Sequence, residues 1–241
     1  MAESRDANGV RRVMGVFAHP DDPEFFAGGT FARWADEGAD ITFVLATSGD
    51  KGSDDPDMTH QRLIEIREQE ERSAAAVLGV RDVVFLRYLD GELQPTLDLR
   101  RDIARMIRLK RPDVVVTCDP TAFWYGTSSI NHPDHRAIGT AVIEAVFPAA
   151  RDRLNFFELA RDEGLEPHKV RQVYISGAQQ PTTKVDISAY LETKINALRE
   201  HRSQIKDMES LEERLRSRLD AESPEEHPRY MESFRVITFD R

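Results

Sequence analysis

Short apolar runs alternate with longer amphipathic segments along most of the chain. Four of the runs have the length and composition of buried strands, and they cover residues 12–18, 41–47, 83–86 and 114–118. The segments that follow them repeat apolar residues at helical spacing, which predicts helices at 23–37, 59–78, 97–110 and 132–146. This alternation predicts an α/β fold, a Rossmann-like three-layer sandwich with a mostly parallel sheet.

The C-terminal part of the chain is less regular. We predict strands at 170–176 and 234–239, and helices at 154–160, 194–204 and 211–219. The polar residues 1–11 are expected to form a loose tail. A chain of 241 residues is long enough for one sizeable α/β domain and short for two, so we predict a single domain over residues 1–241.

Two consecutive glycines interrupt the first predicted helix. Gly28 and Gly29 lie inside it, where a glycine costs about 1 kcal/mol of helix stability relative to alanine. Glycine is favoured where one backbone must approach another element closely. We therefore expect the helix to pack tightly against the first strand at these two positions, with room for a ligand or loop near the site as the alternative.

Charge and cysteine content exclude some classes of function. The formal net charge is −10, whereas a protein that binds nucleic acid needs a basic face, so no nucleic-acid partner is expected. The one cysteine, Cys118, cannot form an intramolecular disulfide and fits a reducing compartment. The first dozen residues contain no apolar signal segment, and no run is long enough to span a bilayer. These features predict a cytoplasmic protein with no membrane partner.

Ionisable residues gather directly after two of the predicted strands. The first strand runs into His19-Pro20-Asp21-Asp22-Pro23-Glu24, and the loop after the fourth contains Asn131-His132-Pro133-Asp134-His135. Buried strands seldom end in so many ionisable groups unless these are paired, solvated or bound to a metal. In open α/β sheets, ligands bind at the carboxyl ends of the strands. We therefore predict that the two clusters meet around one metal ion.

The residue types in these clusters suit metal-assisted hydrolysis. Two imidazoles and one carboxylate are a typical ligand set for Zn²⁺, with a fourth position left for water. The candidate ligands are His19, Asp21, Asp22, His132 and His135. They are too many for a four-coordinate site, so some of them must carry out acid–base chemistry. Structural roles, such as Asp22 capping a helix, are the simpler alternative, but two such clusters at one sheet edge favour the metal site.

The same two clusters resemble a known family. Ala18-His19-Pro20-Asp21-Asp22-Pro23-Glu24, together with Asn131-His132-Pro133-Asp134-His135, is similar to the motifs of the LmbE-like, or PIG-L, family of zinc-dependent N-acetylglucosamine deacetylases. Weaker matches cover nearly the whole chain in the expected order, at Thr47-x-Gly49-Asp50-x-Gly52, Arg67-x-x-Glu70, Asp90-Gly91 and His201-x-Ser203-Gln204. Pro23 departs from the pattern but leaves the ligand positions untouched.

The resemblance implies a role for each matching residue. The implied metal ligands are His19, Asp22 and His135. Asp21 would be the general base, His132 would stabilise the oxyanion, and Asp134 would orient His132. The implied substrate-binding residues are Asp50 and Arg67. The loop that holds Trp124 and Tyr125 does not match the family residue by residue, but either aromatic side chain can stack on a sugar face. No role follows for the motif at His201.

The resemblance also implies the activity and the partners. The chain would be a zinc-dependent hydrolase that removes the N-acetyl group from an N-acetylglucosamine-type sugar or conjugate. Its partner would be that small amino-sugar substrate. A homo-oligomer is possible, since family members often assemble, but the sequence leaves the oligomeric state open. Other divalent transition metals, Fe²⁺ or Co²⁺, fit the same ligand types. The sequence does not identify the sugar, which the loops at 50–59 and 119–131 would select.

Two other functions fit part of the pattern. His19-x-Asp21 with a distant histidine imitates the two-histidine, one-carboxylate triad of non-haem Fe(II) oxygenases. Such oxygenases typically have a β-rich barrel, which the alternation of strand and helix does not predict. A metal-bearing sugar-binding module without turnover is the second alternative, although binding alone would not require both Asp21 and His132.

Overall fold

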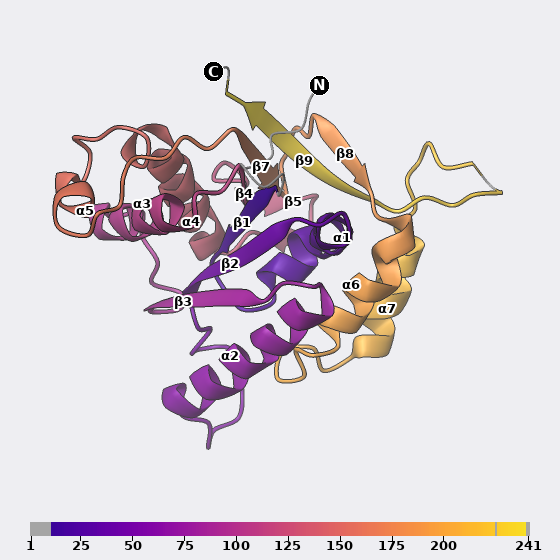
Figure 1. The fold of residues 1–241 in the computed structure, drawn as a ribbon. Coiled ribbons are helices and arrows are strands. Elements are labelled where there is room, and N and C mark those ends of the chain that lie inside the picture. The colour runs from indigo at the N-terminus through magenta and orange to yellow at the C-terminus, as the bar shows by residue number, and fades with distance from the viewer. Residues whose placement is uncertain (1–10, 225, 240–241) are drawn as a thin grey trace.

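A seven-stranded sheet runs through the middle of the molecule (Figure 1). The computed structural model describes residues 11–224 and 226–239. The strand order across the sheet is β3-β2-β1-β4-β7-β9-β8, and β1 to β4 and β7 are parallel. In chain order the strands are β1 (Arg12–Phe17), β2 (Asp40–Thr47), β3 (Asp82–Tyr88), β4 (Val114–Cys118), β7 (Gln172–Ser176), β8 (Thr183–Asp186) and β9 (Met231–Thr238).

Helices cover both faces of the sheet, so the predicted three-layer α/β fold is confirmed. One face is covered by α1 (Asp22–Asp36), α2 (His60–Val77), α6 (Leu191–Leu198) and α7 (Met208–Ser217), and the other by α3 (Leu97–Lys110) and α4 (Pro133–Glu144) (Figure 1). The shorter elements are η1 (Ala145–Ala149), α5 (Phe157–Arg161), η2 (Ser188–Tyr190) and a hairpin of β5 (Trp124–Tyr125) with β6 (Ser129–Ile130). The β-rich barrel of the oxygenase alternative is not the observed fold.

The strand order creates a crevice between β1 and β4. The chain moves outward from β1 to β2 and β3, then returns to the other side of β1 for β4 and β7. Because crossovers between parallel strands are right-handed, reversing direction places the next helix on the opposite face of the sheet. The loops after β1 and β4 therefore diverge, and ligands bind at such a switch point. Both ionisable clusters lie in these loops.

The C-terminal part contains most of the differences from prediction. The helix predicted to continue to 204 ends at Leu198, and residues after it form turns that make polar contacts with α2 and with the loop after β2. Strand β8 was not predicted, and β9 pairs antiparallel with both of its neighbours. The predicted tail at 1–11 lies outside the described residues except for Arg11. None of the helices in 11–224 and 226–239 is long and apolar enough to cross a membrane.

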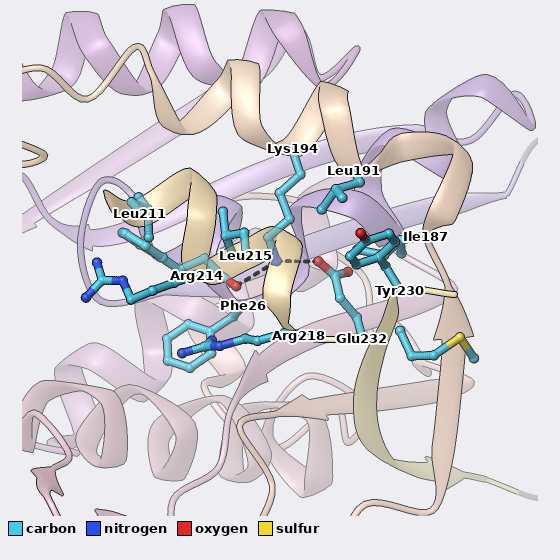
Figure 2. A pocket seen from close by; sticks show the side chains of 12 residues that line it. Phe26, Ile187, Leu191, Lys194, Leu211, Arg214, Leu215, Arg218, Tyr230 and Glu232 are labelled. Atoms are coloured by element: carbon cyan, nitrogen blue, oxygen red, sulfur yellow. Dashed lines mark hydrogen bonds and ion pairs between the residues drawn. The ribbon is translucent and has the colours of Figure 1, made fainter. Parts of the chain in front are cut away.

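Helix α1 is kinked, and a buried ion pair binds the backbone groups around the kink. Ala27 has φ −150° and ψ 19°, which breaks the helical hydrogen-bond ladder. The Lys194 ammonium donates to the Phe25 carbonyl at 2.9 Å, and the Glu232 carboxylate accepts from the N–H groups of Gly29 and Thr30 at 3.0 and 2.8 Å. Figure 2 shows Lys194 and Glu232 pointing toward each other, with 2.6 Å between Nζ and Oε1.

The same region corrects the expected packing of the two glycines. A Cβ atom on Gly29 would lie 2.6 Å from the Ile187 side chain, and one on Gly28 would lie 3.3 Å from that of Lys194. The absence of side chains at the two glycines therefore lets the segment around η2 and α6 pack closely against α1. The predicted contact of these glycines with the first strand is wrong. The ion pair also lines a cavity of about 390 Å³ between α1, α6 and α7, whose apolar walls include Phe26 and Leu215 (Figure 2).

We expect Glu232→Ala to destabilise the protein strongly. The substitution leaves Lys194 buried without its carboxylate and two α1 amides without an acceptor. Removing one partner of a buried ion pair costs about 3–5 kcal/mol, and urea denaturation would measure that loss in the free energy of unfolding. The control is Glu192→Ala, which removes the exposed partner of Arg216 and should cost less than about 1 kcal/mol. Equal losses would contradict this role of the buried pair.

Candidate metal centre

The two ionisable clusters meet at the crevice between β1 and β4. The side chains of His19 and Asp22 follow β1, and that of His135 comes from the first turn of α4. One ligand atom from each lies within 4.8 Å of the other two. His135 Nε2 is 3.0 Å from one oxygen of Asp22, and His19 Nδ1 is 3.5 Å from the other. The predicted meeting of the clusters is thus observed in the fold.

Asp22 is held in place by the loop that carries it. Its Oδ2 atom accepts the backbone N–H groups of Ala18 and His19, at 3.1 and 2.9 Å. The residue is 4% exposed. Burial alone would raise the pKa of its carboxyl group, but His135 and His19 hold that pKa well below its usual range. Asp22 is therefore an ionised and well-oriented ligand candidate.

The other nitrogens of the two histidines have their own partners. His19 Nε2 lies 3.1 Å from Asp90 Oδ1 and 3.3 Å from Asp134 Oδ2, and His135 Nδ1 lies 2.8 Å from the side-chain oxygen of Asn131. Metal-binding histidines usually donate their second N–H to a carboxylate or carbonyl in this way, which fixes the ring and its tautomer. His19 Nδ1 and His135 Nε2 are left facing Asp22.

The carboxylates around His19 make the site favourable for a positive charge. Burial lowers the pKa of His19, but hydrogen bonds to Asp134, Asp22 and Asp90 raise it well above the ordinary value. Burial raises the pKa of Asp90, yet the contact with His19 lowers it to about 2. The cluster of carboxylates thus favours a positive charge at this place. Two imidazoles and one carboxylate with an open side are the donor set of a hydrolytic zinc site.

A second triad, His19, His132 and Asp134, also has ligand atoms within 4.8 Å of one another. The carboxylate of Asp134 is already used, since its oxygens accept the N–H groups of Gly91 at 2.7 Å and Leu93 at 3.3 Å. The Nδ1 atom of His132 accepts the backbone N–H of Asp134 at 3.2 Å. These contacts make this triad the weaker candidate for a metal.

His132 is poised to donate a hydrogen bond into the site. Because its Nδ1 accepts a backbone N–H, the proton of the neutral ring lies on Nε2. Burial and the neighbouring His19 lower the pKa of His132, which favours the neutral form. The carboxylate of Asp134 is 4.0 Å from His132 Nδ1, so the closer contact that orients this ring is the backbone of Asp134.

Asp21 adopts a backbone conformation that is unusual for its residue type. Its φ is 95° and its ψ is −27°, in the left-handed region that costs a non-glycine residue about 1–2 kcal/mol. Its Oδ2 atom lies 3.3 Å from Arg67 Nη2. Burial raises the pKa of Asp21, and the positive charge of Arg67 opposes this. The carboxylate is adjacent to the candidate ligands without being one of them.

Asp50 and Arg67, predicted to bind substrate, both have partners within the protein. Asp50 accepts the backbone N–H of Asp90 at 3.1 Å and lies 3.0 Å from His60 Nδ1. Arg67 is 5% exposed and donates to the carbonyl groups of Gly49 at 3.1 Å and Pro20 at 2.6 Å. Both side chains border the site, and their contact with substrate stays a prediction.

Sequence reasoning missed the residues that orient the ligands. Asp90 and Asn131 were noticed only as parts of motifs, although each follows a strand and therefore had the same positional signal as the ligands. Glu71 had no such signal. It lies inside α2 with no exposed surface and accepts the backbone N–H of Asp21 at 3.0 Å.

Comparison with known proteins places most of the described site within one protein family. Residues 14–146, more than half of the chain, match the family described as GlcNAc-PI de-N-acetylase, PIG-L. This chain belongs to the PIG-L family. The matched segment contains both ionisable clusters, so the resemblance inferred from them is confirmed.

Several members of the PIG-L family are similar along most of the chain. Diacetylchitobiose deacetylase of Thermococcus kodakarensis is 36% identical over 197 residues, covering 82% of this chain and 71% of that protein. A probable N-acetyl-alpha-D-glucosaminyl L-malate deacetylase 2 of Bacillus anthracis is 30% identical over 80% of this chain and 81% of its own. The solved structure of N,N'-diacetylchitobiose deacetylase from Pyrococcus horikoshii has 32% identity and a TM-score of 0.84, covering 95% of this chain and 84% of that one.

The two histidines of the second cluster should differ in their effect on metal binding. His135→Ala removes a candidate ligand, so zinc content per chain after dialysis should fall sharply. His132→Ala removes a ring whose Nδ1 is used by a backbone N–H, so zinc content should stay at the wild-type level. Atomic emission on the purified variants measures both. Equal zinc content in the two variants would refute this division of roles.

Proposed function

We propose that this chain is a zinc-dependent deacetylase that hydrolyses the N-acetyl group of an N-acetylglucosamine-type sugar or conjugate. The observation that carries the proposal is the arrangement around Asp22. Three candidate ligands converge there, the Asp21 carboxylate lies outside that cluster beside Arg67, and the His132 ring lies nearby with a ring centroid 4.6 Å from that of His19. Family membership and the deacetylases among its relatives support the same reaction.

The proposed ligands are His19, Asp22 and His135, and the other groups of the site handle protons. A bound zinc ion lowers the pKa of a water molecule to about 7 and polarises an acyl oxygen. Asp21 would accept the proton of the water molecule that attacks the acetyl carbon. Arg67, at 3.3 Å, favours the ionised form of Asp21 and therefore its action as a base.

The Nε2–H group of His132 supplies the second interaction. Attack converts the acetyl carbonyl to a tetrahedral oxyanion, and a preorganised donor stabilises this developing charge more than it stabilises the ground state. Asp21 then returns its proton to the leaving nitrogen as the carbon–nitrogen bond breaks. The products are acetate and the free amino sugar, so the reaction consumes one water and needs no other reactant.

The rim of the crevice fits a sugar. The β5–β6 hairpin belongs to the loop after β4, and it exposes large apolar side chains that can stack on a sugar ring. Trp124 is 64% exposed, and the neighbouring Phe123 is 54% exposed. Diacetylchitobiose is the first substrate to test, because two similar relatives are named for it.

The deciding experiment measures acetate release from a panel of N-acetylglucosamine compounds that includes diacetylchitobiose. The protein is assayed as purified, after treatment with a chelator, and after zinc is restored. We expect release that the chelator abolishes and zinc restores. Zinc bound by the protein with no release from any sugar would overturn the proposal and favour a larger amide substrate or a binding module without turnover.

Asp21→Asn should separate catalysis from metal binding. The amide keeps the shape of the side chain but cannot accept a proton, so kcat should fall by about 10²- to 10⁴-fold, the usual worth of general acid–base catalysis. Zinc content should remain that of the wild type. A variant that loses its metal would show that Asp21 is a ligand, which contradicts the assignment of the base.

A further inference from the structure

Three ionisable side chains form a second cluster behind the metal centre. They are Glu24 on α1, Glu71 on α2 and His201 in the turn after α6, and each has no exposed surface. His201 Nε2 lies 3.3 Å from an oxygen of Glu24 and 3.9 Å from an oxygen of Glu71. Fully buried ionisable groups are costly unless they are paired or hydrogen-bonded, and burial raises the pKa of both glutamates well above its ordinary value. The proposed reaction uses none of the three.

The cluster is connected to the general base through one peptide group. The peptide between Pro20 and Asp21 has its carbonyl bound by Arg67 Nη2 at 2.6 Å and its N–H bound by Glu71 Oε2 at 3.0 Å. Arg67 and Glu71 are one turn apart on α2, so they face the same side of that helix. Helix α2 thus holds both polar ends of this peptide group.

Asp21 requires such support. It occupies the left-handed region at φ 95°, and its side chain caps no N–H of α1. Residues in sparsely populated backbone conformations persist when the surrounding structure holds them there. If the Pro20–Asp21 peptide rotated toward an ordinary conformation, the carboxylate of Asp21 would point elsewhere, while Asp22 could stay bound to the amides of Ala18 and His19.

We propose that Glu71 is a positioning residue that, with Arg67, clamps the Pro20–Asp21 peptide and so aims the Asp21 carboxylate at the reacting water. The inference rests on the proposed function, since that function makes Asp21 the base. His201 in turn holds Glu71 against Glu24. This gives the motif at His201 a role that its sequence alone did not reveal.

The rest of that motif fastens the same turn to α2. Ser203 donates its backbone N–H and its hydroxyl to the carboxylate of Glu70, at 2.9 and 2.6 Å. Gln204 donates to the carbonyl of Gly52 at 3.0 Å. The turn therefore docks beside the clamp at two neighbouring residues of α2, Glu70 and Glu71. The position of Glu71 therefore depends on the Asp21 amide just before α1 and on His201 in this turn.

The test compares two substitutions of Glu71. Glu71→Ala removes the acceptor, and we expect kcat to fall by about 10- to 100-fold with KM within about twofold, because misplacing a catalytic group by about 1 Å can cost that much. Glu71→Gln retains an oxygen that accepts the Asp21 N–H, so kcat should stay within about fivefold of the wild type. The matched control is Glu68→Ala, which removes another buried carboxylate of α2, one bound to Ser48 and Arg87. It should leave kcat unchanged even if stability falls.

A second measurement does not depend on activity. The NMR shift of the Asp21 amide proton reports its bond to a carboxylate, and we expect that shift to move strongly in Glu71→Ala and little in Glu68→Ala. This measurement tests the proposed role of Glu71 even if the wild-type protein releases no acetate. The lack of acetate release would contradict the proposed function and not the role of Glu71. Zinc content should be equal in all variants.

Three outcomes would overturn the clamp. In the first, the Glu71→Ala variant keeps the wild-type kcat and the wild-type NMR shift of the Asp21 amide proton. Another is the loss of one of two metal equivalents in that variant, which would show that Glu24, Glu71 and His201 themselves bind a metal, as their spacing allows. The third applies if Glu71→Ala does not fold: a drop of about 100-fold in Glu71→Gln would show that the charge of Glu71 matters and that its hydrogen bond to the Asp21 N–H does not suffice.

Discussion

The burial of carboxylates at the switch point is the constraint on which the rest of this structure depends. The loops after β1, β3 and β4 contain little regular structure beyond the short β5–β6 hairpin, and backbone N–H groups that leave water there must find acceptors. Asp22 accepts two such groups from its own loop, and Asp134 accepts two from the loop after β3. The carboxylates thereby order the loops, and the resulting negative charge in turn favours histidines and a cation between them.

The strands below the loops are mostly apolar. All five residues of β4 are buried, as are most of those in β1 and β2, so their carboxyl ends are held rigidly by apolar packing. Helix α1, which starts at Asp22, is less regular than these strands because it bends at Ala27. The Lys194–Glu232 pair satisfies the backbone groups that the bend frees, so the first turn can follow the loop while the rest of α1 follows the sheet.

Sequence reasoning found what depends on local pattern and missed what depends on tertiary contact. The alternation of strand and helix predicted the sheet, and the two clusters predicted where side chains would converge. Strand β9 was predicted at 234–239 and is observed at Met231–Thr238, but the short edge strand β8 was missed because it has no apolar run to mark it. The predicted helix to 204 overran Leu198 because the following residues are held by Glu24 and Glu70 on other helices. The role of Glu71 was missed for the same reason. The helical pattern of α2 does not show that the carboxylate of Glu71 accepts the N–H of the strained residue Asp21.

Two adjacent carboxylates can have different roles only if the backbone separates them. In a regular helix, neighbouring side chains point about 100° apart around one axis, and both Asp21 and Asp22 would compete for the same helix N-terminus. Here Asp21 is left-handed, and Asp22 begins the helix with its carboxylate turned back onto the loop amides. One carboxylate therefore faces the two histidines and the other faces Arg67. The left-handed backbone at this single residue thus allows the proposed division of roles, in which Asp22 is a ligand and Asp21 is a base.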